Sequence, residues 1–291
     1  MSRHIMFFGF GFCAAALAPH LARDGWQMSA TTRDQARAPA LSEAGVTPLV
    51  LGDYASDMLD MGSYSHFLVS APPAPDGSDP AFDFLAPRLH ETRSAQTHWI
   101  GYLSTTGVYG DHDGAWIEED TPPGPLGARG ARRVAAEQKW SDFGAASDIA
   151  VQHFRLAGIY GPRRNALTSL RAGTARRINK PGQVFSRIHV ADIAQILFAA
   201  LHCDIGARNF SVCDDEPAPP ADIVTYAAEL LGLEPPPIQD FETADLSDMA
   251  RSFYSENKRI RNNRIKDELG VSLLYPSYRE GLSALFAAGE F

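Results

Sequence analysis

Cysteine is scarce in this chain of 291 residues, which contains only Cys13, Cys203 and Cys213. An odd number without the spacing of a disulfide framework favours a reducing compartment over a secreted fold. No apolar run reaches the roughly 20 residues that a membrane-spanning helix requires. The apolar start, Met1–Ala18, is similar to a signal peptide, but two glycines interrupt it in a patterned way. We therefore expect a cytoplasmic protein with no membrane partner.

Basic residues are also in the minority. The chain has 26 lysines and arginines against 35 aspartates and glutamates, which gives a net charge of −9. Such a surface repels a phosphate backbone wherever no local patch reverses the charge, so no nucleic-acid partner is expected. With 45% hydrophobic and 21% charged residues, the composition is that of a globular protein with a sizeable core.

Short apolar runs alternate with helical patterns over the first half of the chain. This alternation is typical of βαβ units in a parallel sheet. The six expected strands are Ile5–Phe8, Trp26–Ala30, Thr47–Leu51, His66–Ser70, Trp99–Ser104 and Ile149–Leu156. They predict an α/β fold of the Rossmann type, with a doubly wound parallel sheet. The second half alternates less clearly and predicts a small C-terminal α/β lobe.

A glycine-rich turn follows the first expected strand and precedes a helical pattern. The segment Gly9–Ala14 reads GFGFCA, a match to GxGxxA in the context that makes this motif informative. Gly9 permits the tight turn, Gly11 lets the backbone approach a pyrophosphate, and Ala14 allows close packing of helix on strand. The residues expected to contact a dinucleotide here are Gly9, Phe10, Gly11, Phe12, Cys13 and Ala14.

The residue that reads the adenine ribose is expected about 20 residues further on, at the end of the second strand. The chain has Thr31, Thr32, Arg33 and Asp34 there. Hydroxyl groups and a guanidinium suit a 2′-phosphate, whereas a carboxylate suits a free 2′-hydroxyl. Thr32 and Arg33 therefore favour NADP over NAD, and Asp34 keeps NAD open as the less favoured cofactor.

A helical pattern at Val190–Leu201 is expected to return the chain to the sheet. We therefore assign residues 1–160 and 186–208 to an NAD(P)-binding Rossmann domain. The smaller substrate-binding lobe is assigned to residues 161–185 and 209–291.

Positive charge is concentrated in one stretch of this acidic chain. Residues 149–191 contain no Asp or Glu but carry eight basic side chains. These are Arg155, Arg163, Arg164, Arg171, Arg176, Arg177, Lys180 and Arg187. An anionic ligand would explain the asymmetry, namely the cofactor phosphates, a phosphorylated or nucleotide-linked substrate, or an acidic patch of a second subunit. A solvated, charge-balancing face is the alternative.

Three further segments resemble the extended and atypical short-chain dehydrogenase/reductase superfamily, the NAD(P)-dependent epimerase/dehydratase group. They are Tyr102–Gly110 (YLSTTGVYG), Arg155–Pro162 (RLAGIYGP) and Arg187–Ile193 (RIHVADI). Asn257–Ile260 and Glu268–Gly270 are similar to the C-terminal region of that group. With the glycine turn, these motifs cover most of the chain.

The resemblance implies roles for several more residues. Asp53 would lie at the adenine end of the cofactor, and Thr105 is at the position of the catalytic Ser or Thr. That hydroxyl would bond the substrate oxygen and stabilise developing charge. The residues implied on the ribose and nicotinamide side are Ser70, Ala71, Pro72, Leu156, Ala157 and Gly158.

The Tyr and Lys pair that donates the proton in this superfamily is missing. The aligned positions hold Arg129 and Arg133. Arg133 could still bond the ribose, but a guanidinium does not titrate at ordinary pH, so Arg129 cannot donate a proton. Tyr109 is the candidate replacement, with His112 and His189 as alternatives, although a structural role is favoured for each.

Two functions follow from these patterns. The first is an NADP-binding, epimerase/dehydratase-like oxidoreductase that acts on a small anionic molecule derived from a sugar or nucleotide. Thr105 would polarise the substrate, and Arg163 or Arg187 would bind its anionic group. The alternative is a non-catalytic NADP(H)-binding redox sensor. No metal site is expected, and the resemblance implies a possible homodimer.

Overall fold

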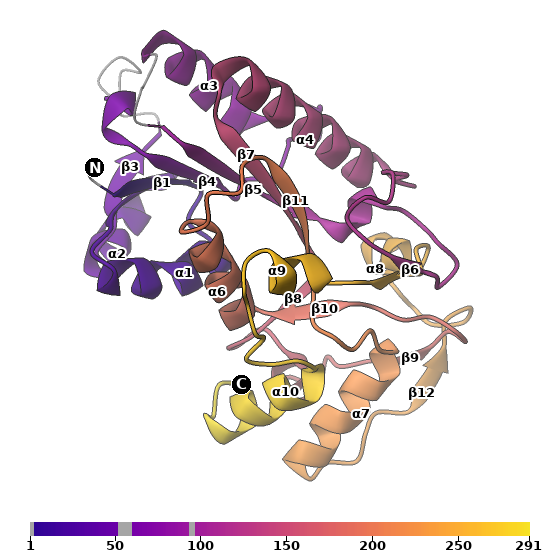
Figure 1. Cartoon of the computed structure of the whole chain (residues 1–291). Coiled ribbons are helices and arrows are strands. Elements are labelled where there is room, and N and C mark those ends of the chain that lie inside the picture. Colours follow the sequence, from indigo (N-terminus) through magenta and orange to yellow (C-terminus); the bar gives the residue numbers. More distant parts are fainter. Residues whose placement is uncertain (1–2, 52–59, 93–96) are drawn as a thin grey trace. The chain divides into compact units, whose positions relative to one another are not determined.

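The computed structural model describes residues 3–51, 60–92 and 97–291 (Figure 1). These residues form two compact units. The first unit consists of Met1–Thr105, Gly127–Arg155 and Ile193–Phe210, and the second unit of Thr106–Leu126, Leu156–Asp192 and Ser211–Phe291.

Seven strands form one large sheet, in the order β11-β7-β5-β4-β1-β2-β3. Its strands are β1 (His4–Phe8), β2 (Gln27–Thr32), β3 (Thr47–Val50), β4 (His66–Val69), β5 (Trp99–Thr105), β7 (Ala150–Leu156) and β11 (Arg208–Val212). The pairs β1/β2, β2/β3, β1/β4 and β4/β5 are parallel. The predicted α/β class and the six predicted strands are therefore confirmed.

Helices cover both faces of this sheet, as a doubly wound fold requires. The helices of the first unit include α1 (Phe12–Arg23), α2 (Ala38–Glu43), α3 (Pro80–Thr92) and α4 (Ala128–Ser147). Figure 1 shows α3 and α4 on one face and α1 and α2 on the other. Trp140 of α4 and Leu85 of α3 are fully buried in a core with Phe67 and Ile100 of the sheet. This apolar packing holds α3 and α4 against the sheet.

The seventh strand corrects the expected boundary at residue 209. The expected lobe resumes at residue 209, but β11 (Arg208–Val212) belongs to the large sheet. Phe210 stacks on Phe154 of β7 with ring centroids 5.5 Å apart, and this aromatic contact adds to the hydrogen bonds between the two strands. The helix expected at Val190–Leu201 is present as α6 (Val190–Ala200).

The second unit is built from short strand pairs and helices. The pairs are β6 (Trp116–Ile117) with β13 (Arg259–Ile260), β8 (Gly158–Tyr160) with β10 (Arg187–His189), and β9 (Arg177–Asn179) with β12 (Ile238–Asp240). Its helices are α5 (Ala166–Arg171), α7 (Pro220–Leu231), α8 (Asp248–Phe253), α9 (Asn263–Asp267) and α10 (Tyr278–Ala287).

The expected Rossmann domain includes residues 106–126, 156–160 and 186–192, but these segments belong to the second unit. For residues 106–126 the reason is hydrogen bonding to the C-terminal segment, since β6 pairs with β13 and the N–H groups of His112 and Gly114 donate to the Asn257 carbonyl. Such long-range pairing has no local sequence signal.

Candidate functional site

The glycine turn is held by side chains of two neighbouring strands. Gly9 has φ +87°, a conformation that side chains rarely adopt. Its N–H donates to Thr31 Oγ1 at 2.9 Å, and its carbonyl accepts from Ser70 Oγ at 2.8 Å. A Cβ atom on Gly9 would lie 2.9 Å from Ser70 Oγ. Gly9 is therefore required by the turn itself, and Ser70 is one of its supports.

Gly11 meets a different requirement. It is the N-cap of α1 with φ −104°, and no heavy atom lies within 4 Å of the place where its Cβ would be. The helix starts without a capping side chain and without an acidic residue in its first turn. A helix start of this kind favours an anion, because its first N–H groups and dipole carry positive charge. The turn therefore fits the pyrophosphate of a dinucleotide.

Two guanidinium groups follow β2, with Arg33 directly after the strand and Arg37 in the short helical turn Gln35–Arg37. Arg33 is exposed, and Arg37 Nη2 donates to the Phe10 carbonyl of the glycine turn at 3.1 Å. The nearby carboxylate of Asp34 caps the next turn by accepting from the Ala36 N–H at 2.9 Å. Thr32 Oγ1 is also engaged locally, with the backbone of Asp34. Arg37 was not among the cofactor-binding residues predicted from the sequence. Its position four residues after Arg33 could have indicated a second guanidinium near the glycine turn.

Arg133 of α4 is fixed beside the end of β5. It contacts this strand at Leu103, which precedes the candidate Thr105 by two residues. Its Nη1 donates to the Leu103 carbonyl at 2.7 Å and to the Tyr102 hydroxyl at 3.1 Å. The guanidinium also lies over the Tyr102 ring, 5.4 Å from its centroid. Burial raises the pKa of Tyr102, so its phenol stays protonated. Thr105 itself is half-buried at the strand end, where catalytic groups of this fold are found.

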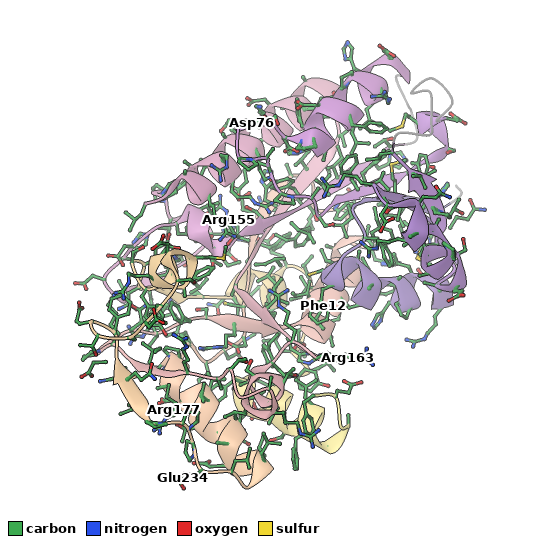
Figure 2. The ribbon with its side chains drawn as sticks, turned by 180° about the vertical axis from the view of Figure 1, so that it is seen from behind. Phe12, Asp76, Arg155, Arg163, Arg177 and Glu234 are labelled. Atoms are coloured by element: carbon green, nitrogen blue, oxygen red, sulfur yellow. The ribbon has the colours of Figure 1, made fainter. Side chains whose placement is uncertain are left out.

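A buried ion pair lies one helical turn beyond Arg133. Glu137 of α4 accepts from Arg155 Nη2 at 2.8 Å and from Ser104 Oγ at 2.5 Å. The side chains of Arg155 and Glu137 are only 5% and 7% exposed. Arg155, labelled in Figure 2, thus extends from β7 to α4, and Ser104 joins β5 to the same carboxylate. The network fixes the strand end next to Thr105 and was not predicted, because its partners are distant in sequence.

The predicted site residues are divided between the two units. The first unit contains the glycine turn, Thr32, Arg33, Ser70, Ala71, Pro72, Thr105 and Arg133. The second contains Tyr109, Leu156, Ala157, Gly158, Arg163 and Arg187. Leu156 and Ala157 are buried and Gly158 is exposed. Asp53 lies outside the described residues.

Tyr109 occupies a structural position. It is 1% exposed, and its hydroxyl is hydrogen-bonded to Ser211 Oγ at 2.9 Å. A phenol in that environment has no access to a substrate, which weighs against proton donation by Tyr109. His189 is buried as well, and burial lowers its pKa to about 4. His112 contacts the Tyr109 carbonyl through Nε2 at 3.1 Å.

The two arginines expected to bind a substrate anion have other contacts. Arg187 Nη1 donates to the carbonyls of Phe185 and Ala218, at 2.8 and 3.1 Å. Burial lowers its pKa, and the nearby charge of Asp214 opposes that shift. Burial raises the pKa of Asp214 to about 8. Arg163 is exposed in a turn with φ +58°, and its N–H donates to the Glu290 carbonyl. These contacts weigh against Arg187 as a ligand for substrate.

The basic stretch is not one patch. Arg155 is neutralised by Glu137 in the first unit, while Arg187 is buried in the second. Arg171 lies over the Phe291 ring, 4.3 Å from its centroid. Arg177 and Lys180 line a pocket of the second unit. An explanation of the whole stretch by one anion is therefore wrong, and only part of it is available to a ligand.

Among the residues that the structure describes, no group of three or more His, Cys, Asp and Glu side chains could hold a metal ion. None of the helices in the described part of the chain is both long enough and apolar enough to span a membrane.

Comparison with known proteins identifies the family. Residues 89–212 match the model of the NAD dependent epimerase/dehydratase family. Protein YeeZ of Escherichia coli (strain K12) is 30% identical over 282 residues, covering 92% of this chain and 94% of YeeZ. A solved structure of a functionally unknown conserved protein from Silicibacter pomeroyi is 48% identical, with a TM-score of 0.91 over 100% of both chains.

A more distant structure shares the fold. It is the UDP-glucuronic acid 4-epimerase from Bacillus cereus in complex with UDP-glucuronic acid and NAD. It is 15% identical to this chain, with a TM-score of 0.76 and coverage of 98% of each chain. The sequence motifs, the seven-stranded sheet and these matches agree, and the chain belongs to the NAD-dependent epimerase/dehydratase family.

Proposed function

We propose that this chain is an NADP-dependent oxidoreductase of the epimerase/dehydratase type. Its substrate would be a small anionic molecule derived from a sugar or nucleotide. The observation that carries the proposal is the glycine turn, with Gly11 facing open space and with Arg33 and Arg37 in the segment that follows β2. The ligands of the Bacillus cereus structure, NAD and UDP-glucuronic acid, support the cofactor and substrate classes.

The first unit would hold the cofactor. The pyrophosphate would lie at the start of α1, against the backbone of Gly11. Arg33 and Arg37 would bind the 2′-phosphate, because two guanidinium groups match a dianion and the Asp34 carboxylate is already engaged as a cap. The nicotinamide would supply or accept a hydride.

Thr105 would act on the substrate. Its hydroxyl at the end of β5 would donate a hydrogen bond to the reacting oxygen and stabilise charge that develops there. Arg133 would keep that strand end in place through Leu103 and Tyr102. No tyrosine stands at the usual proton-donor position, so the proton at the substrate oxygen would come from solvent or from the substrate itself.

The activity is tested by a substrate screen with the nicotinamide absorbance as readout. UDP-glucuronic acid, glucose 1-phosphate and related compounds are added to protein with NADP or NADPH. We expect at least one to be converted, with a net change of nicotinamide absorbance for an oxidation or reduction and with a new product but regenerated cofactor for an epimerisation or dehydration. Thr105→Val should slow that turnover by about tenfold or more. Thr106→Val serves as the matched control. Equal rates for the Thr105 variant and the wild type would remove Thr105 from the mechanism.

The missing Tyr and Lys pair supports a second candidate, a non-catalytic NADP(H)-binding redox sensor. A sensor requires different affinities for NADP and NADPH, since a ligand shifts an equilibrium only through differential affinity. Equal affinities and no cofactor-dependent partner would contradict it. A homodimer and a cytoplasmic location remain proposals.

A further inference from the structure

The second unit contains a pocket of about 340 Å³. It is formed by β9, the loop that follows it and the start of α7, with Arg259 of β13 at its wall. Ligand pockets in proteins begin at roughly this size, about 300 Å³. It suits a small molecule rather than a dinucleotide.

Positive charge dominates the pocket wall. Arg177, Lys180 and Arg259 line it, and Asp222 is the single acidic residue among the lining residues. Arg177 Nη1 donates to the Pro236 carbonyl at 3.1 Å, Lys180 Nζ to the Tyr254 carbonyl, and Arg259 Nη1 to the Gly114 carbonyl. Carbonyl oxygens orient these groups without neutralising them, so the pocket favours an anion.

Two polar atoms of the lining residues are buried without a hydrogen-bond partner in the described part of the chain. They are Arg177 Nε, a donor, and Gln183 Oε1, an acceptor. Gln183 is 2% exposed, and its Nε2 donates to the Glu256 carbonyl at 2.7 Å, which fixes the orientation of the amide. A buried polar group without a hydrogen-bond partner is energetically unfavourable. A ligand with both an anionic oxygen and a hydroxyl would satisfy both atoms.

The start of α7 also lines the pocket, with Pro219, Pro220 and Ala221. Both prolines lack an N–H group and Asp222 lies in the first turn of the helix, so this helix start contributes little attraction for an anion. The preference for an anion therefore rests on the three cations.

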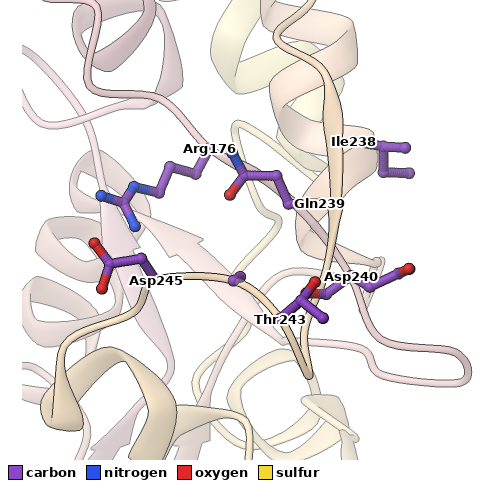
Figure 3. A pocket seen from close by; sticks show the side chains of 7 residues that line it. Arg176, Ile238, Gln239, Asp240, Thr243 and Asp245 are labelled. Atoms are coloured by element: carbon purple, nitrogen blue, oxygen red, sulfur yellow. The ribbon is translucent and has the colours of Figure 1, made fainter.

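A second pocket, of about 520 Å³, provides a contrast. Arg176 lines it together with Asp240 and Asp245, so acidic side chains offset its single cation. Figure 3 shows the charged ends of Arg176 and Asp245 on the same side of this pocket. Arg176 and Arg177 are adjacent in sequence but contribute to pockets of opposite charge balance. This makes Arg176 a matched control.

We propose that the pocket of Arg177, Lys180, Gln183 and Arg259 binds a phosphorylated, hydroxyl-bearing small molecule. The cations would hold the phosphate, and Gln183 Oε1 would accept from a hydroxyl of the ligand. The inference rests on the proposed function, because this ligand belongs to the anionic, sugar-derived class proposed for the substrate.

Calorimetric titration of the full chain tests the pocket without any turnover. The probes are glucose 1-phosphate, inorganic phosphate and glucose. We expect glucose 1-phosphate to bind more tightly than inorganic phosphate, and glucose to bind least. Arg177→Gln and Lys180→Gln should each weaken glucose 1-phosphate binding by about tenfold, whereas Arg176→Gln should change it less than about twofold.

Two more variants keep the test independent of misfolding. Asp222→Asn removes the one negative charge and should tighten binding of glucose 1-phosphate. Gln183→Leu should reduce the preference for glucose 1-phosphate over inorganic phosphate. Equal effects of the Arg176 and Arg177 variants would overturn the proposal that this pocket binds the ligand. The absence of binding for both glucose 1-phosphate and inorganic phosphate would also overturn it. If glucose 1-phosphate binds as expected but no compound of the substrate screen is turned over, only the proposed reaction is contradicted.

Discussion

Replacing Glu137 by alanine is expected to destabilise the protein by about 3–5 kcal/mol. The variant leaves the Arg155 guanidinium buried without its carboxylate partner and removes the acceptor of the Ser104 hydroxyl. The cost of a buried, uncompensated charge exceeds that of a lost surface pair. Chemical denaturation followed by circular dichroism measures the change in the free energy of unfolding.

The control for this prediction removes both charges at once. A Glu137→Leu, Arg155→Met double variant replaces the pair by apolar side chains of similar length, and it should recover most of the lost stability. Gln138→Ala, at an exposed position of the same helix, should change stability by less than about 0.5 kcal/mol. A Glu137→Ala variant within about 1 kcal/mol of the wild type would contradict the account of the network.

Gly11→Ala is expected to weaken dinucleotide binding strongly while the protein stays folded. The φ of −104° is open to alanine, and the new methyl group would meet no protein atom within 4 Å. It would instead project into the space that the proposed pyrophosphate needs. We expect the affinity for NADP to fall by about a hundredfold or more, which corresponds to about 2.7 kcal/mol. Calorimetry measures the affinity, and thermal unfolding measures the fold.

Gly127→Ala is the matched control. Gly127 is the N-cap of α4, has φ −123°, and also has no heavy atom near its Cβ position. That variant should bind NADP as the wild type does. Gly9→Ala is a poorer test, since its positive φ and the contact with Ser70 would strain the turn itself. Tight NADP binding by the Gly11 variant would show that the cofactor does not approach this glycine.

The elements that could be predicted are those with local signals. The six strands have continuous apolar runs, and the glycine turn has a fixed spacing. The strand β11 was missed because Arg208, Asn209 and Ser211 interrupt its apolar pattern, and its place in the sheet depends on contact with β7. Burial in a sheet can override local composition in this way.

The candidate site was predictable only in part, for the same reason. Arg37 contacts a turn 27 residues earlier, and Glu137 joins Ser104 and Arg155, which are 33 and 18 residues away. Two cations of the pocket, Arg177 and Lys180, belong to the basic stretch that is visible in the sequence. The third, Arg259, lies far along the chain and could not be connected with them. Charge density along a sequence does not show which charges are neutralised in the fold.

The most direct test of the central claim is calorimetric titration of the wild-type chain with NADP, NADPH and NAD. The account predicts that NADP or NADPH binds with one site per chain and about tenfold or more tighter than NAD, because Arg33 and Arg37 favour the 2′-phosphate. Equal or tighter binding of NAD would contradict the cofactor assignment. No binding of any dinucleotide would contradict both proposed functions and leave the Rossmann fold as a scaffold alone.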